Sequence, residues 1–96
     1  MYEVSHQLYL EVWQRLMDEI AGREFFAGNV SVVAGNVDCK LTCTLIVGYD
    51  QLNDAGCSGS IASKITPVWW EFHTTEGNEE MINDFSFREM CQAAAI

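Results

Sequence analysis

The sequence predicts a single α+β domain over residues 1–96, with the element order α-β-β-β-β-α. Three observations carry this prediction: an amphipathic helical pattern over residues 5–21, strict two-residue alternation over residues 37–49, and a helix-capping sequence near the C-terminus. The simplest arrangement is a four-stranded antiparallel meander with the N-terminal and C-terminal helices packed on one face.

The first helix is predicted over residues 5–21. Ser5 can act as its N-cap by accepting a hydrogen bond from a free backbone N–H, and Gly22 suits the left-handed residue that ends a helix. At about 100° per residue, the apolar side chains fill one broad arc of this helix. They are Leu8, Tyr9, Leu10, Val12, Trp13, Leu16, Met17 and Ile20.

Two strands are predicted next, over residues 24–33 and 37–49, joined by Ala34, Gly35 and Asn36. Glycine and asparagine supply the positive φ that tight hairpin turns need. The second strand alternates cleanly, so one of its faces should be buried. Its buried series is Val37, Cys39, Leu41, Cys43, Leu45, Val47 and Tyr49. In the first strand, Gly28 and Asn29 indicate a bulge or a break.

The remaining strands follow a segment rich in Gly, Ser, Asn and Asp, residues 50–64, which is predicted to be a long loop. Residues 65–74 form the third strand, and Pro67 should lie at its start or on a sheet edge because proline has no N–H to donate. The chain turns at 76–79, and residues 80–85 form the fourth strand.

The C-terminal helix is predicted from the capping box of Ser86 and Glu89. Phe87, Met90, Cys91 and Ala94 follow at helical spacing, which indicates a short helix with one apolar face.

Charge excludes several function classes. The chain carries 14 acidic and 5 basic residues, a formal charge of −9. A nucleic-acid binder needs clustered Lys and Arg, and so does a protein that docks on an anionic membrane, so neither partner is expected. The N-terminus lacks the features of a signal peptide, and no apolar run could span a membrane. A cytoplasmic location with reduced cysteines is therefore expected.

The cysteines give no metal or catalytic motif. Cys39 and Cys43 lie about 13 Å apart on one strand face at roughly 3.3 Å per residue, too far to share a zinc ion. They and Cys91 are expected to be buried and inert. Cys57 is expected in the loop and could act as a nucleophile only if a base such as His73 lay beside it. No catalytic residue, metal or cofactor is predicted.

The third strand gives the candidate site. Val68, Trp70 and Phe72 should face the helices, which leaves the opposite face of the strand open. The candidate binding residues on this open face are Lys40, Thr42, Thr44, Trp69, Glu71 and His73, with Asn83 or Asp84 beside them from the fourth strand. Three interpretations remain: a cross-strand ladder that only stabilises the sheet, an interaction surface, or catalysis or metal binding by Glu71 and His73. The last would rest on an acid–base pair, since two ligands are too few for a metal site.

Residues 66–74 (TPVWWEFHT) and 83–87 (NDFSF) carry a resemblance to small uncharacterised proteins of gut Bacteroidetes. It covers the second half of the chain. Some of those proteins belong to mobile-element or conjugative-transposon neighbourhoods. The resemblance implies no activity, so it assigns no functional residue here.

The leading functional hypothesis is a non-enzymatic protein–protein interaction module, a homodimer or a subunit of a larger assembly. The alternative is a small ligand-binding or enzymatic α+β domain that uses the open sheet face. A second alternative is an acidic DNA mimic from a mobile element, which would need carboxylates spaced like phosphates along one face.

Overall fold

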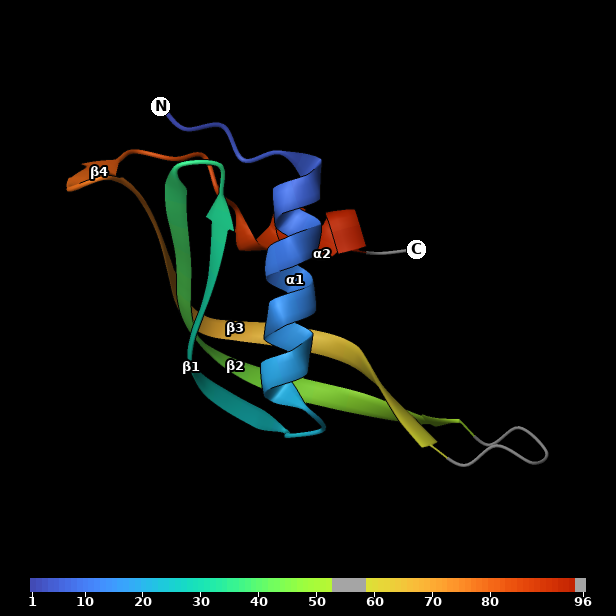
Figure 1. Cartoon of the computed structure of the whole chain (residues 1–96). Coiled ribbons are helices and arrows are strands. Elements are labelled where there is room, and N and C mark those ends of the chain that lie inside the picture. The colour runs from blue at the N-terminus through green and yellow to red at the C-terminus, as the bar shows by residue number, and fades with distance from the viewer. Residues whose placement is uncertain (53–58, 95–96) are drawn as a thin grey trace.

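A four-stranded antiparallel sheet with two helices makes up the chain, in a computed structural model that describes residues 1–52 and 59–94 (Figure 1). The elements are α1 (His6–Ile20), β1 (Phe25–Ala34), β2 (Val37–Leu52), β3 (Gly59–Glu76), β4 (Glu79–Met81) and α2 (Phe87–Ala94). The strands lie in the order β1-β2-β3-β4. The predicted fold, an α-β-β-β-β-α meander, is confirmed.

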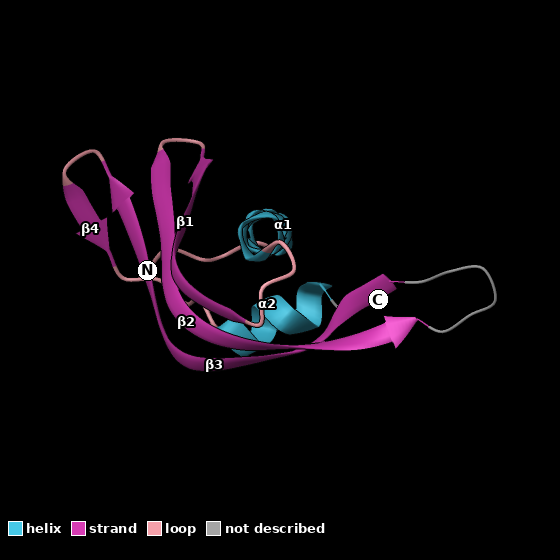
Figure 2. Cartoon of the chain, turned by 90° about the horizontal axis from the view of Figure 1, so that it is seen from below, coloured by secondary structure: helices cyan, strands magenta, loops and turns pink. Residues whose placement is uncertain are grey.

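Both helices lie on one side of the sheet, as predicted. Figure 2 shows that β2 and β3 bend sharply and that α1 and α2 sit inside the bend. We therefore call the covered side the concave face and the open side the convex face. Ser5 caps α1 as expected, since its Oγ accepts from the Leu8 N–H at 3.1 Å. The helix ends through two left-handed residues, Ala21 (φ 43°) and Gly22 (φ 84°).

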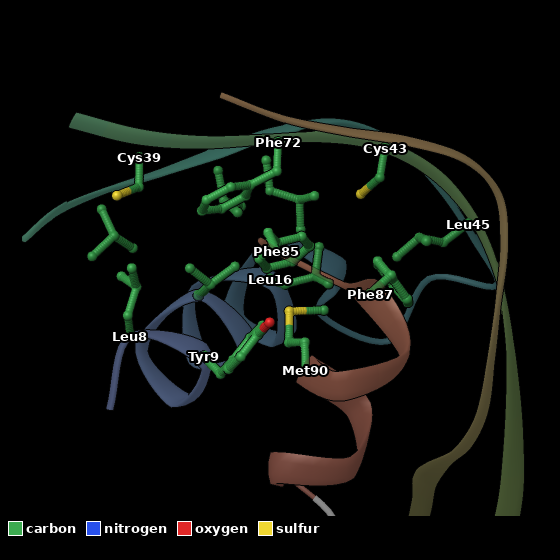
Figure 3. Packing of buried hydrophobic residues seen from close by; sticks show 14 of the residues in the cluster. Leu8, Tyr9, Leu16, Cys39, Cys43, Leu45, Phe72, Phe85, Phe87 and Met90 are labelled. Atoms are coloured by element: carbon green, nitrogen blue, oxygen red, sulfur yellow. The ribbon is translucent and has the colours of Figure 1, made fainter. Parts of the chain in front are cut away.

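The alternation predicted for β2 is confirmed from Val37 to Val47. The buried series of β2 packs against α1 and α2. In Figure 3, Cys39, Cys43 and Leu45 point from the sheet to the side of the helices, with Cys39 above Leu8 and Leu45 beside Phe87. Leu16, Leu41, Leu45 and Met90 are completely buried. The side chain of Tyr49, the last of the predicted series, lies outside the described part of the structure.

The loop predicted over residues 50–64 is wrong for residues 50–52 and 59–64, and residues 53–58 lie outside the described part of the structure. β2 continues to Leu52 and β3 begins at Gly59, and their backbones pair from Tyr49↔Ala62 to Leu52↔Gly59. These residues form an arm that projects from the sheet and lengthens the molecule to 52 Å, against 23 and 18 Å in the other directions (Figure 2). Backbone hydrogen bonds between strands do not depend on side-chain type, so a Gly- and Ser-rich segment can still pair.

The bulge predicted at Gly28 and Asn29 is also wrong, because β1 and β2 pair without interruption from Phe25↔Ile46 to Ala34↔Val37. Glycine is favoured at position 28 for a different reason. A Cβ at Gly28 would lie 3.2 Å from Cζ of the buried Phe26, so the ring occupies the space that a side chain would fill. At the hairpin turn, Gly35 (φ 62°) supplies positive φ and Asn36 does not.

Two irregularities lie instead between β2 and β3, one at Thr44/Leu45 and one at Gly48/Tyr49. Thr44 pairs with Trp69 while Leu45 pairs with Pro67, so Val68 is an extra residue on β3. It was expected to face the helices with Trp70 and Phe72, but it is 62% exposed because the extra residue interrupts the alternation. Pro67 lies on an edge of the sheet, as predicted, because β4 pairs only with residues 74–76 of β3.

The predicted fourth strand is shorter than expected, because β4 ends at Met81. Asn83 leaves the ladder and donates from Nδ2 to the Phe72 carbonyl at 3.0 Å. The N-terminal segment takes the next place, since Tyr2 forms a parallel bridge with Asn83.

The capping box of α2 forms with an unexpected third member. The Ser86 Oγ accepts from the Glu89 N–H at 3.4 Å, as predicted. Glu89 does not return a bond to the Ser86 N–H. That N–H donates to the Tyr9 hydroxyl at 3.2 Å, and the hydroxyl donates to the Glu89 carboxylate at 3.1 Å. Tyr9 therefore joins α1 to the start of α2.

Candidate functional site

The six predicted site residues lie together on the convex face. They form three successive cross-strand pairs between β2 and β3: Lys40↔His73, Thr42↔Glu71 and Thr44↔Trp69. Trp69 is 50% exposed. The prediction that Asn83 or Asp84 lies beside these residues is wrong. Asn83 bonds to the β3 backbone, and Asp84 accepts from the Val4 N–H. Glu80 lies beside His73 instead.

His73 sits between two carboxylates. Its Nε2 lies 3.0 Å from Oε2 of Glu71, and its Nδ1 contacts the carboxylate of Glu80 on β4. Hydrogen bonds that the His73 ring donates to these carboxylates, to Glu71 first and then to Glu80, raise the pKa of His73 above its ordinary value. The protonated ring can donate to both carboxylates at once, and neither nitrogen is then left to accept a proton. The arrangement therefore suits an ionic clamp between β3 and β4 better than a general base.

The described residues offer no metal site, since no three His, Cys, Asp or Glu side chains gather closely enough to hold an ion. Cys39 and Cys43 are buried as predicted, and burial raises the pKa of the Cys43 thiol to about 11. Cys91 was expected to be buried as well, but it is only partly buried. Cys57 lies outside the described residues, and so does its predicted relation to His73.

One end of the convex face is apolar. Phe25 (58% exposed) pairs with Ile46 (54%), and the next row holds Trp69 with Val68 (62%) beside it in the chain. We call Phe25, Ile46, Val68 and Trp69 the convex patch. Of these, the sequence prediction included only Trp69. The signal for Ile46 was present, because it falls in the outward series of β2, but the neighbour Phe25 emerges only from the strand register.

Hollows that are open to solvent border the described part of β3. Two adjoin His73 and measure about 400 and 420 Å³; one is lined by Trp70, Phe72 and Glu80, and the other by Val33, Asp38 and Lys40. Another hollow, of about 380 Å³, lies between β3 and α2. Its lining residues include Pro67, Trp70, Phe87, Arg88 and Cys91.

No protein-family model, curated protein or solved structure matches this chain. Within residues 1–52 and 59–94, neither helix has the length and the apolar character that a membrane crossing requires.

Proposed function

We propose that this chain is a non-enzymatic protein–protein interaction module, a subunit of a larger assembly, and that its convex patch is the docking surface. The observation that carries the proposal is the grouping of Phe25, Ile46 and Trp69, each at least half exposed at outward positions of neighbouring strands, with the exposed Val68 next to Trp69 in the chain. Neither helix covers this face of the sheet (Figure 2).

The patch is not needed to complete the protein's own core. The core is closed on the concave side by Leu16, Leu41 and Met90, none of which has any measurable exposure. Large apolar side chains left in water on one contiguous surface are typical of interaction sites, and tryptophan is enriched where binding energy concentrates.

The surroundings of the patch fit the same function. Lys40, Glu71 and His73 follow it along the same face, which gives an apolar centre beside a charged margin, the usual composition of a protein interface. The shape also restricts the partner. Because the face is convex, an identical face could touch it only over a narrow contact, so a flat or concave surface on another protein fits better.

The engagement of both His73 nitrogens favours this function over acid–base catalysis. A ligand-binding role would need an enclosed pocket on the convex face, and the hollows beside His73 are open to solvent.

The test is to purify the chain from its native host under mild conditions, as wild type and as a Trp69→Ser/Ile46→Thr variant. A stoichiometric partner should co-purify with the wild type and be lost from this variant. The matched control is Ile82→Thr, because Ile82 is 79% exposed but lies outside the patch. Hydroxyl-radical footprinting of the purified complex should protect Trp69 and Ile46 and leave Ile82 unprotected. Equal labelling of Trp69 in the free and bound chain would refute the proposal.

A further inference from the structure

The β1 strand is an edge of the sheet. It pairs with β2 along its whole length, and within the described part of the chain no strand lies along its other side. The backbone N–H and C=O groups on that side are therefore available to another strand, which makes an exposed edge a site of association unless it is protected.

β1 carries none of the protections that a strand can provide through its own residues. Proteins shield an edge with short strands, charged side chains, proline, a bulge or a covering helix, and of these β1 has only α1, which packs against it from the concave side. β1 is 10 residues long, its sequence FFAGNVSVVA contains no charged residue and no proline, and its register with β2 is uninterrupted. The opposite edge of the sheet differs, because β4 has three residues of which two are glutamates, and the exposed edge of β3 carries Pro67.

The exposed side chains of β1 match each other across a two-fold axis. Its two large exposed apolar residues are Phe25 (58%) and Val33 (67%), and both point to the convex side with the exposed Asn29 midway between them. A two-fold axis perpendicular to the sheet keeps the convex faces of both copies on one side. Only registers that pair exposed positions with exposed positions are then allowed. The register centred on Asn29 places Phe25 of each copy opposite Val33 of the other.

The concave side of the same register is also apolar. It would place Phe26 opposite Val32 and Gly28 opposite Val30 of the second copy, all of which belong to, or lie beside, the core of their own chain. The pairing therefore continues both faces of the sheet and brings no charge into the contact.

We infer that the chain is a homodimer in which the β1 strands of two copies pair antiparallel about Asn29, so that the two sheets join into one. The inference rests on the proposed function in one respect, since it takes the chain to be an assembly subunit. The dimer would present two convex patches on the same side, each extended by Val33 of the other copy.

Charge substitutions on β1 test the contact by sedimentation equilibrium. The wild type should dimerise at micromolar concentrations. Asn29→Lys should weaken the dimer at least tenfold, because the two substituted side chains would meet at the axis. Phe25→Lys and Val33→Asp should each weaken it as well. The double variant Phe25→Lys/Val33→Asp should recover affinity to within a few-fold of the wild type, since opposite charges then face each other at both ends of the pairing.

Disulfide trapping tests the register. Under mild oxidation, Asn29→Cys should give a covalent dimer, because directly paired Cα atoms lie about 4.5–5.5 Å apart, within disulfide reach. The matched control is Ala27→Cys, which is also exposed on β1 but faces position 31 of the second copy and should stay monomeric under reducing-agent-free denaturing electrophoresis. Circular dichroism confirms that each variant folds.

The outcomes separate this inference from the proposed function. A wild type that is monomeric at all concentrations, or a dimer that Asn29→Lys leaves unchanged, would overturn the inference. The convex patch could still bind its partner in that case. A dimer that Trp69→Ser abolishes while Asn29→Lys spares it would move self-association to the patch and overturn the β1 pairing alone.

Discussion

Removal of the Tyr9 hydroxyl should destabilise the fold, because this one oxygen joins two hydrogen bonds. The hydroxyl accepts from the Ser86 N–H at 3.2 Å and donates to the Glu89 carboxylate at 3.1 Å, and Tyr9 is only 6% exposed. The Tyr9→Phe substitution keeps the ring, which packs against Phe85 with 5.3 Å between ring centroids. The change therefore isolates the hydrogen bonds.

The expected magnitude follows from the two partners. A neutral hydrogen bond contributes about 0.5–1.5 kcal/mol net, and a bond to a charged group about 1.5–3 kcal/mol. Glu89 is exposed, so water replaces much of what its carboxylate loses. We expect a loss of about 2 kcal/mol, which for a domain of this size lowers the Tm by roughly 8–16 °C.

Urea unfolding followed by far-UV circular dichroism measures this loss, provided that the m-value stays constant. Glu89→Gln is the matched control. It keeps an oxygen that can accept from Tyr9 and should reduce stability by less than about 1 kcal/mol. If Tyr9→Phe has the same urea midpoint as the wild type, or if Glu89→Gln lowers the midpoint more, the hydrogen bonds of the Tyr9 hydroxyl do not contribute to the free energy of unfolding.

Two further predictions concern titrating side chains. Because the folded-state pKa of His73 is raised, its clamp stabilises the protein fully below about pH 6.5 and loses this contribution as the pH rises through the folded-state pKa. The site is exposed, so the effect should stay below about 1 kcal/mol. An NMR titration should show the pKa of His73 falling in Glu71→Gln and Glu80→Gln, and an unchanged pKa in both would disprove the clamp.

Cys43, with its pKa raised to about 11, should have roughly one thiolate per thousand molecules at pH 8. Its labelling by a thiol reagent should proceed only as fast as the protein unfolds in urea, and rapid labelling of the native protein would contradict its burial.

The features that the sequence predicted are those that repeat. The α1 helix shows its apolar period over several turns, and β2 alternates over six confirmed positions from Val37 to Val47. Each repeat adds independent evidence for the same face, so a single exception such as Leu10, which is 39% exposed, does not disturb the prediction. The candidate pairs on the convex face followed directly, because once two strands are antiparallel neighbours their outward residues must meet.

The features that sequence could not give depend on contacts far along the chain. The Ser86 N–H finds the hydroxyl of Tyr9 at a separation of 77 residues. His73 meets Glu80 rather than Asn83 or Asp84 because β4 is only three residues long. The extra residue at Val68 arises in the β2–β3 register, and its local mark, Pro67, is equally compatible with a strand start or a sheet edge. The arm was missed because its backbone pairing needs no side-chain pattern.

Gly28 shows how a correct local signal can have a different physical cause. A bulge would make glycine necessary for its backbone, whereas the structure makes it necessary for the Phe26 ring, which would lie 3.2 Å from an added Cβ. In a regular strand, alanine is favoured over glycine by about 0.5–1 kcal/mol, but crowding a buried ring costs about 1–3 kcal/mol. Phe26 is only 5% exposed and has little room to shift, so crowding should win and Gly28→Ala should destabilise the protein by about 0.5–2 kcal/mol. In a Phe26→Leu background the same change should become stabilising by about 0.5–1 kcal/mol, because the smaller side chain leaves the space free. Urea unfolding of the wild type, the two single variants and the double variant measures this change of sign. Equal effects of Gly28→Ala in both backgrounds would show that the Phe26 ring is not the reason for glycine at position 28.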